Sequence, residues 1–316
     1  MDQVFAESMY ENIIFIGCGT SFYLAQSAAH LFASQTGLDA KAVPCSEIYY
    51  YPKRYVGCHK HTLVIPMTRK SITTEVRMAI DCVRKLENVR TLSITCDPES
   101  KTYNDYMIHS PEAHEDSVVM TRSYSSMLYI ALIMSLYVAG KKDEITALLN
   151  LPRLAGEALP KIDAFTKMIV NENPGINLYV TLGQGEFFGI AAESMNKVKE
   201  MGLVHSEAYY SLEYRHGPMS IADKHTLILL FSKRDCEAHE TKLLSQLKGF
   251  GARVAVIGED VEAFEAPYKL SLKLGIDDMS LAPVISFAGQ LLGYHTADSK
   301  GLDADGPRNL SQAIVL

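Results

Sequence analysis

The chain has 316 residues, of which 47% are hydrophobic and 21% charged, a composition that suits a globular protein with a sizeable core. Its net charge of −7 argues against a nucleic-acid-binding protein, which would carry a basic face, but still permits a locally positive pocket. No apolar run approaches the roughly 20 residues of a membrane-spanning helix, and no basic signal peptide opens the chain. Single cysteines without a C-x-x-C pair favour a cytoplasmic protein with free thiols and no structural zinc; they stand at positions 18, 45, 58, 82, 96 and 236.

The first predicted elements are a buried strand at residues 12–16, a glycine turn at Gly17–Ser21, and a helix. Glycines in such a turn let backbone N–H groups approach an anion, and the helix N-terminus adds a favourable dipole. The third glycine of the dinucleotide fingerprint is missing, because residue 22 is Phe, and no G-x-x-x-x-G-K-[ST] motif exists. The turn therefore predicts an anion site without a nucleotide cofactor.

A second predicted strand, at residues 62–66, leads into a polar turn before the next helix. Between Thr68 and Thr74 the chain carries four hydroxyl groups and two cations, Arg69 and Lys70. Ligands of doubly wound sheets bind at the carboxyl ends of the strands. A solvated, well-capped loop would explain this turn alone, but two hydroxyl-rich turns at adjacent strand ends favour a phosphate site.

The same order of elements then repeats in the second half of the chain. A third strand is predicted at residues 89–95, and from residue 177 the order strand, glycine turn and helix returns at an offset of 166 residues, with later strands at 226–231 and 253–258. Apolar strands alternating with helices predict parallel sheets covered on both faces. We therefore expect an α/β protein made of two tandem doubly wound, flavodoxin-like domains, at 1–150 and 151–316.

The second half carries the groups suited to proton transfer. Glu193, Lys197 and Glu200 share one helix face, and His216 precedes a Gly-Pro turn. An exposed ion pair and a structural turn histidine would explain them separately, but the density of ionisable groups between Lys197 and His216 argues against purely structural roles. A histidine suits protonation of a sugar ring oxygen, and a desolvated glutamate suits proton transfer between C1 and C2.

These residues resemble the sugar isomerase (SIS) domain family, specifically its tandem members such as the isomerase half of glucosamine-6-phosphate synthase. The resemblance runs from Asn12 to Leu316. It rests on five motifs: Gly17–Ser21, Val119–Ser123, Ser206–Tyr209, Glu213–Pro218 and Pro307–Leu310.

The resemblance implies a role for individual residues. It implies that Glu200 moves the C1–C2 proton and that His216 opens the ring, donated across the interface of a homodimer. The phosphate would be held by Ser21, Thr68, Arg69, Lys70 and Thr73, and the sugar by Gly19, Thr20, Val118, Lys197 and Gln312.

Three positions depart from the family pattern. Lys70 replaces a small hydroxyl residue, and Ser71 replaces a glycine, which tests whether this turn needs a positive φ. Gln312 stands where the synthase has a lysine that is linked to the open-chain sugar, and a glutamine cannot form an imine.

The resemblance favours a glucosamine-6-phosphate deaminase/isomerase that gives fructose 6-phosphate and ammonia. A fructosamine-6-phosphate deglycase and a simple aldose–ketose phosphosugar isomerase remain open, as does a phosphosugar-binding sensor without activity. No cofactor, metal, nucleic acid or membrane partner is expected.

Overall fold

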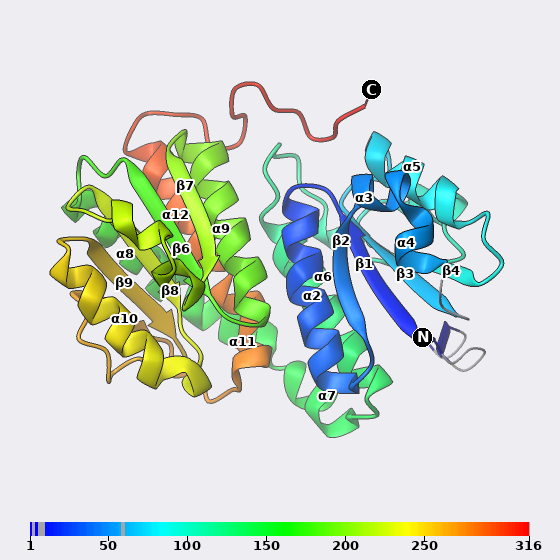
Figure 1. The fold of residues 1–316 in the computed structure, drawn as a ribbon, viewed down its shortest axis with the longest axis horizontal. Coiled ribbons are helices and arrows are strands. Elements are labelled where there is room, and N and C mark those ends of the chain that lie inside the picture. The colour runs from blue at the N-terminus through cyan, green and yellow to red at the C-terminus, as the bar shows by residue number, and fades with distance from the viewer. Residues whose placement is uncertain (2–3, 6–9, 58–60, 316) are drawn as a thin grey trace. The chain divides into compact units, whose positions relative to one another are not determined.

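Figure 1 shows the computed structural model, which describes residue 1 and residues 4–5, 10–57 and 61–315. Cys58 lies outside these residues. The chain divides into two compact units, Met1–Leu148 with Leu310–Leu316, and Leu149–Asn309. The predicted boundary lies near residue 150, with the tail in the second domain; in the structure the tail, Leu310–Leu316, groups with the first unit.

The first unit is built on five parallel strands in the order β2-β1-β3-β4-β5. Its strands are β1 Asn12–Gly17, β2 Ala40–Pro44, β3 Thr62–Thr68, β4 Val89–Thr95 and β5 Tyr106–His109. Its helices are α2 Thr20–Thr36, α3 Cys45–Tyr50, α4 Pro52–Val56, α5 Thr74–Val83, α6 Arg122–Val138 and α7 Lys142–Leu148, with short 3-10 helices η1 Pro98–Thr102 and η2 Pro111–Ala113.

The core of this unit follows from the apolar strands. Every residue of β1 and β3 is buried, as expected of central strands that are covered on both faces. Alternate residues of β1 serve opposite faces: Ile14 and Ile16 join the cluster formed with α3, α4 and α5, while Phe15 contacts Phe32 of α2 at a ring distance of 5.9 Å. Both faces of the sheet are thereby closed.

The second unit has five parallel strands in the order β10-β9-β8-β6-β7. Its strands are β6 Leu178–Gly183, β7 His205–Tyr210, β8 Thr226–Phe231, β9 Arg253–Gly258 and β10 Tyr268–Ser271. Its helices are α8 Leu151–Glu172, α9 Glu186–Gly202, α10 Glu237–Gly249, α11 Asp278–Ile285 and α12 Phe287–Asp298, with 3-10 helices η3 Glu213–Arg215, η4 Pro218–Ile221 and η5 Arg234–Cys236.

The two sheets have the same topology. In each, the first strand along the chain, β1 or β6, lies next to an edge strand, and the order of the strands switches sides between β1 and β3 or between β6 and β8. The predicted tandem of doubly wound α/β domains is confirmed. The four edge strands β2, β5, β7 and β10 escaped prediction because they are short and mostly half-buried or exposed, which removes the continuous apolar signal. Among the described residues, no helix combines the length and apolar character needed to cross a bilayer.

Helices α9 and α12 approach each other unusually closely. A Cβ atom built on Gly289 of α12 would lie 1.8 Å from Ser194 Oγ and 2.7 Å from Ser194 Cα on α9. One turn later, a Cβ on Gly293 would lie 2.8 Å from the carbonyl oxygen of Lys197. The two glycines therefore allow the contact that buries the middle of α9.

A Gly289→Ala substitution should destabilise the protein by about 1–3 kcal/mol, because the new methyl group overpacks this contact and backbone must move. Urea denaturation followed by circular dichroism measures the change. Gly156→Ala on α8 is the matched control: no heavy atom lies within 4 Å of its Cβ position, so it should gain up to about 1 kcal/mol of helix propensity. Equal stabilities for the two variants would contradict the close contact.

Candidate functional site

The turn between β1 and α2 presents the first unit's glycine motif. Gly19 adopts a φ of 54° at the N-cap of α2, a conformation that favours glycine, and Gly185 repeats it with 58° before α9. Thr20 and Ser21 are buried in the first turn of α2, and the Ser21 hydroxyl points to Met120 Sδ at 3.7 Å. No acidic residue occupies the first turn of α2, so its positive end carries no carboxylate of its own.

The turn between β3 and α5 is internally ordered. Thr68 Oγ1 donates to the Lys70 carbonyl oxygen at 2.8 Å, and the Ser71 N–H donates to Asp97 Oδ2 at 2.8 Å. Thr73 is the N-cap residue of α5, although its side chain makes no capping hydrogen bond. Ser71 is not among the residues with a positive φ, so the turn tolerates a serine where the family pattern has glycine.

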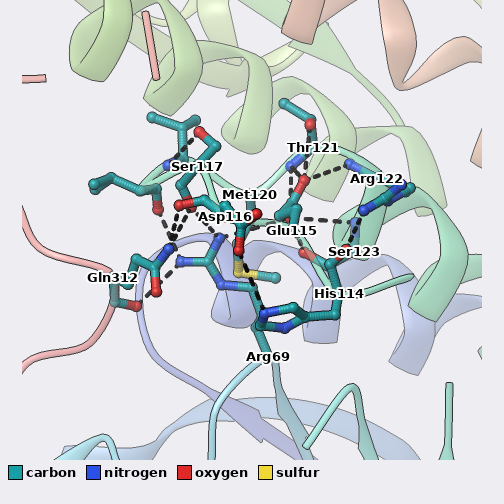
Figure 2. Close-up of polar contacts among 12 residues, drawn as sticks. Arg69, His114, Glu115, Asp116, Ser117, Met120, Thr121, Arg122, Ser123 and Gln312 are labelled. Atoms are coloured by element: carbon teal, nitrogen blue, oxygen red, sulfur yellow. Dashed lines mark hydrogen bonds and ion pairs between the residues drawn. The ribbon is translucent and has the colours of Figure 1, made fainter. Parts of the chain in front are cut away.

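Arg69 is buried and hydrogen-bonds the backbone of neighbouring segments (Figure 2). Its guanidinium donates to the carbonyl oxygens of Ser117 and Val118 at 2.8 Å each, and to that of Gln312 at 3.1 Å. The Glu115 carboxylate lies 3.7 Å away. Arg69 therefore joins three segments that are distant in the sequence, and the predicted contact residue Val118 meets it through its backbone.

Glu115 is the residue of this region that sequence reasoning missed. Its carboxylate accepts hydrogen bonds from the N–H groups of Thr121 and Arg122 at 3.0–3.2 Å, and from the hydroxyls of Thr121 and Ser123. It thereby fills the N-terminus of α6 with a negative charge. The hydroxyls of the Val119–Ser123 motif are directed at this carboxylate, and the sequence offers only an acid shortly before the helix as a signal.

The tail crosses the β3–α5 turn. The Gln312 side chain accepts a hydrogen bond from Lys70 Nζ and donates one to the Asp116 carbonyl oxygen. Two residues later, the carbonyl oxygen of Ile314 accepts the Thr74 N–H of α5 at 3.0 Å. The structure thus brings Lys70 and Gln312 together, with Arg69 and Val118 close by.

In the second unit, Lys197 lies wholly buried between two carboxylates of its own helix. Its Nζ is 3.0 Å from Glu193 Oε1 and 2.8 Å from Glu200 Oε2. Burial by itself would lower the pKa of Lys197, but the two carboxylates outweigh it and hold the pKa above its ordinary value. Glu193 is buried as well, whereas the Glu200 side chain is 23% exposed, so one carboxylate of the triad reaches solvent.

His216 directly follows the 3-10 helix η3 and is exposed. Its backbone N–H donates to the Glu213 carbonyl oxygen at 3.0 Å. Gly217, with a φ of 120°, turns the chain directly afterwards. A depression of about 420 Å³ lies beside this turn, lined by Arg215, Gly217, Met219, Ser220, Ala222 and Phe250. Among the described residues, no hydrogen bond or ion pair joins His216 to Glu200.

Buried Glu240 of α10 anchors the segment that leads to His216. Its carboxylate accepts hydrogen bonds from the hydroxyls of Ser211 at 2.9 Å and Ser232 at 2.7 Å. Burial raises the pKa of Glu240, and the two hydroxyl donors only partly offset this effect. The end of β7 and the end of β8 are thereby tied to one side chain.

The second glycine turn holds its own ion pair. Glu186, in the first turn of α9, is wholly buried and lies 2.9 Å from Lys233 Nζ, which follows β8. A protein carboxylate thus stands where the first unit has Thr20. The N-terminus of α9 is therefore already occupied by a carboxylate of the protein.

Comparisons with known proteins fit this geometry. The SIS domain profile matches residues 9–139 and 178–292. A glutamine–fructose-6-phosphate aminotransferase (isomerizing) from Sulfurisphaera tokodaii is 28% identical over 308 residues, which are 97% of this chain and 50% of that protein. The chain spans about half the length of the curated relatives it matches.

Solved structures give the same answer for the fold. The glucosamine-6-phosphate deaminase from Thermotoga maritima aligns with a TM-score of 0.83 and 28% identity, over 99% of this chain and 93% of that one. A tagatose-6-phosphate ketose/aldose isomerase from Escherichia coli aligns with a TM-score of 0.77 over 99% of this chain and 88% of that one, and its 22% identity supports the fold alone.

Replacing Lys197 by Met should destabilise the protein by about 3–5 kcal/mol, because Glu193 would keep a buried charge without its cation. Lys197→Met combined with Glu193→Met should recover most of this loss, since no buried charge is then left alone. Urea denaturation of both variants measures the difference. A double variant no more stable than Lys197→Met would contradict the compensating role of the pair.

Glu240 predicts a pH dependence of stability. Its pKa is raised in the folded protein, so its stabilising contribution is complete below the ordinary value of 4.5 and is lost as the pH rises through the folded value. The stability of the wild type relative to Glu240→Gln should therefore fall with rising pH, by about 1.4 kcal/mol for each unit by which the pKa is raised. Denaturation titrations from acidic to neutral pH test this, with exposed Glu265→Gln as control; a rising difference would contradict it.

Proposed function

Because the chain belongs to the SIS domain family, we propose that it is a phosphosugar isomerase that converts glucosamine 6-phosphate into fructose 6-phosphate and ammonia. The likeness to the Thermotoga maritima deaminase supports this choice, since it extends over nearly all of both chains at 28% identity. The aminotransferase from Sulfurisphaera tokodaii supports a related sugar phosphate, although this chain matches only half of that protein.

The arrangement of Lys197 and Glu200 carries the proposal. Moving a proton between C1 and C2 requires a carboxylate that reaches the substrate in one fixed orientation. Glu200 is partly exposed, and its Oε2 is held at 2.8 Å by an ammonium group that is itself wholly buried. In the proposed reaction Glu200 takes the C2 proton and returns it at C1, leaving a C2 imine that water hydrolyses to the ketose and ammonia.

Ring opening is assigned to His216, which would donate a proton to the ring oxygen. The side chain is exposed on a turn and makes no hydrogen bond with Glu200, so it is available to a substrate held elsewhere. Our proposal includes a cytoplasmic homodimer in which His216 serves the site of the second copy.

Phosphate binding is assigned to the first unit. The α2 N-terminus offers Gly19, Thr20 and Ser21 without a competing acid, and the β3–α5 turn adds hydroxyls and charge. The donors proposed there are Thr68, Thr73 and Lys70. Arg69 contributes its positive charge and orders the turn, because its terminal nitrogens already bind the carbonyl oxygens of Ser117, Val118 and Gln312.

The sugar contacts are assigned to residues already held in place. Lys197 reaches the substrate through its pair with Glu200, and Val118 and Gln312 are held by Arg69. Gln312 has no amine and so forms no covalent bond with the sugar. In the proposed reaction the Gln312 amide hydrogen-bonds the open-chain sugar, which is bound without a covalent link to the protein.

Incubation with glucosamine 6-phosphate should release ammonia and fructose 6-phosphate in equal amounts. Glu200→Gln should lower kcat by about 10²–10⁴-fold, the usual contribution of general base catalysis. Glu172→Gln, at an exposed acid of α8, should keep full activity.

Other products would assign a different reaction. Release of a free amino acid from a fructosamine 6-phosphate would replace deamination by deglycation. Solvent deuterium at C1 or C2 of a simple hexose phosphate, without ammonia from the aminosugar, would indicate aldose–ketose isomerisation. Binding of these sugars with no turnover above the Glu200→Gln background would leave a sensor and refute the enzyme.

A further inference from the structure

Cys18 and Cys45 lie side by side at the carboxyl edge of the first sheet. Strands β1 and β2 pair in parallel with Gly17 opposite Pro44, so the residues that follow these two positions are neighbours. Cys18 packs against the apolar cluster that contains Cys45, and both thiols are free. Neighbouring strands are about 4.8 Å apart, within the roughly 4.4–6.8 Å between Cα atoms that a disulfide spans.

The two thiols differ in exposure. Cys45 begins α3 and is 1% exposed, whereas Cys18 is half-buried within the glycine turn. The neighbouring Cys18 thiol raises the pKa of Cys45, and burial and nearby negative charge, including that of Glu75, raise it further. Cys45 therefore keeps its proton, and Cys18 is the thiol that a small oxidant reaches first.

We propose that Cys18 and Cys45 are a reversible redox pair, oxidised by hydrogen peroxide to a disulfide that displaces the Gly17–Ser21 turn. The Cys18 thiolate attacks one peroxide oxygen, the O–O bond breaks, and hydroxide leaves, which gives a sulfenic acid. The Cys45 sulfur then attacks the Cys18 sulfur, and the sulfenic hydroxyl departs with the Cys45 proton as water. The hydroxide takes up the proton that Cys18 released on forming the thiolate, so two thiols lose two electrons in total and one peroxide is reduced to two water molecules.

Bridge formation has a direct consequence for the turn. The sulfurs must close from a non-bonded separation to a bond length of about 2.05 Å, and buried Cys45 sits at the start of a packed helix. Cys18 therefore moves, and its carbonyl oxygen is the acceptor of the Ser21 N–H at 3.1 Å. The first turn of α2 is disturbed with it. That this weakens phosphosugar binding rests on the function proposed above.

The chemistry is tested by treating the full chain with hydrogen peroxide. Wild-type protein should become about 2 Da lighter, with one peptide pair linked through Cys18 and Cys45, and dithiothreitol should reverse both changes. Cys45→Ser should stop at a Cys18 sulfenic acid, which a dione reagent traps. Cys82→Ser, at a half-buried cysteine of α5, should still form the bridge. Absence of the linked pair, or an equal mass loss in peroxide-treated Cys45→Ser, would overturn the proposal.

The structural consequence is tested on the same samples. Amide hydrogen exchange at Thr20 and Ser21 should be about tenfold faster in the bridged protein and unchanged in peroxide-treated Cys45→Ser. Affinity for glucosamine 6-phosphate, measured by calorimetry, should fall about tenfold on bridging. A bridge that changes neither quantity refutes displacement of the turn. If the reduced protein does not bind this sugar, the function proposed above fails, while linkage and exchange still decide the redox pair.

Discussion

The Glu115 carboxylate at the N-terminus of α6 shows how this protein distributes negative charge at the carboxyl ends of its strands. Parallel sheets gather helix N-termini at one edge, and their N–H groups and dipoles need acceptors. In the second unit, Glu186 occupies the first turn of α9 and pairs with Lys233. The first turn of α2 has no such acid, so its N-terminus carries no carboxylate of its own helix.

The burial of Lys197 imposes the second constraint. An ammonium group without solvent is tolerated because two carboxylates flank it on the same helix, at positions four residues before and three residues after. The close approach at Gly289 and Gly293 excludes water from this part of α9. Packing therefore holds Glu193, Lys197 and Glu200 in a fixed triad, although their spacing is that of an exposed ion pair. Partly exposed Glu200 is the member of this triad that reaches solvent.

The tail shows how distant segments shape the turn between β3 and α5. Arg69 donates hydrogen bonds to backbone carbonyl oxygens of two other segments, and these bonds hold its charge in place. No local sequence pattern predicts them, because the segments are far apart along the chain. Gln312 and Ile314 contact the same turn through Lys70 and Thr74. The two residues that depart from the family pattern, Lys70 and Gln312, thus contact each other, and the tail packs on the turn between β3 and α5.

The sequence by itself determined the tandem α/β fold, the six central strands and the glycine turns, because fully buried parallel strands produce unbroken apolar runs. It also put Lys197 and Glu200 on one helix face, since that relation depends only on helical spacing. Tertiary structure alone decided that Lys197 is buried, that Glu115 caps α6 and that Arg69 binds backbone carbonyl groups. These features depend on which surfaces exclude water and which loops meet, and such contacts between residues far apart leave no periodic trace in the chain.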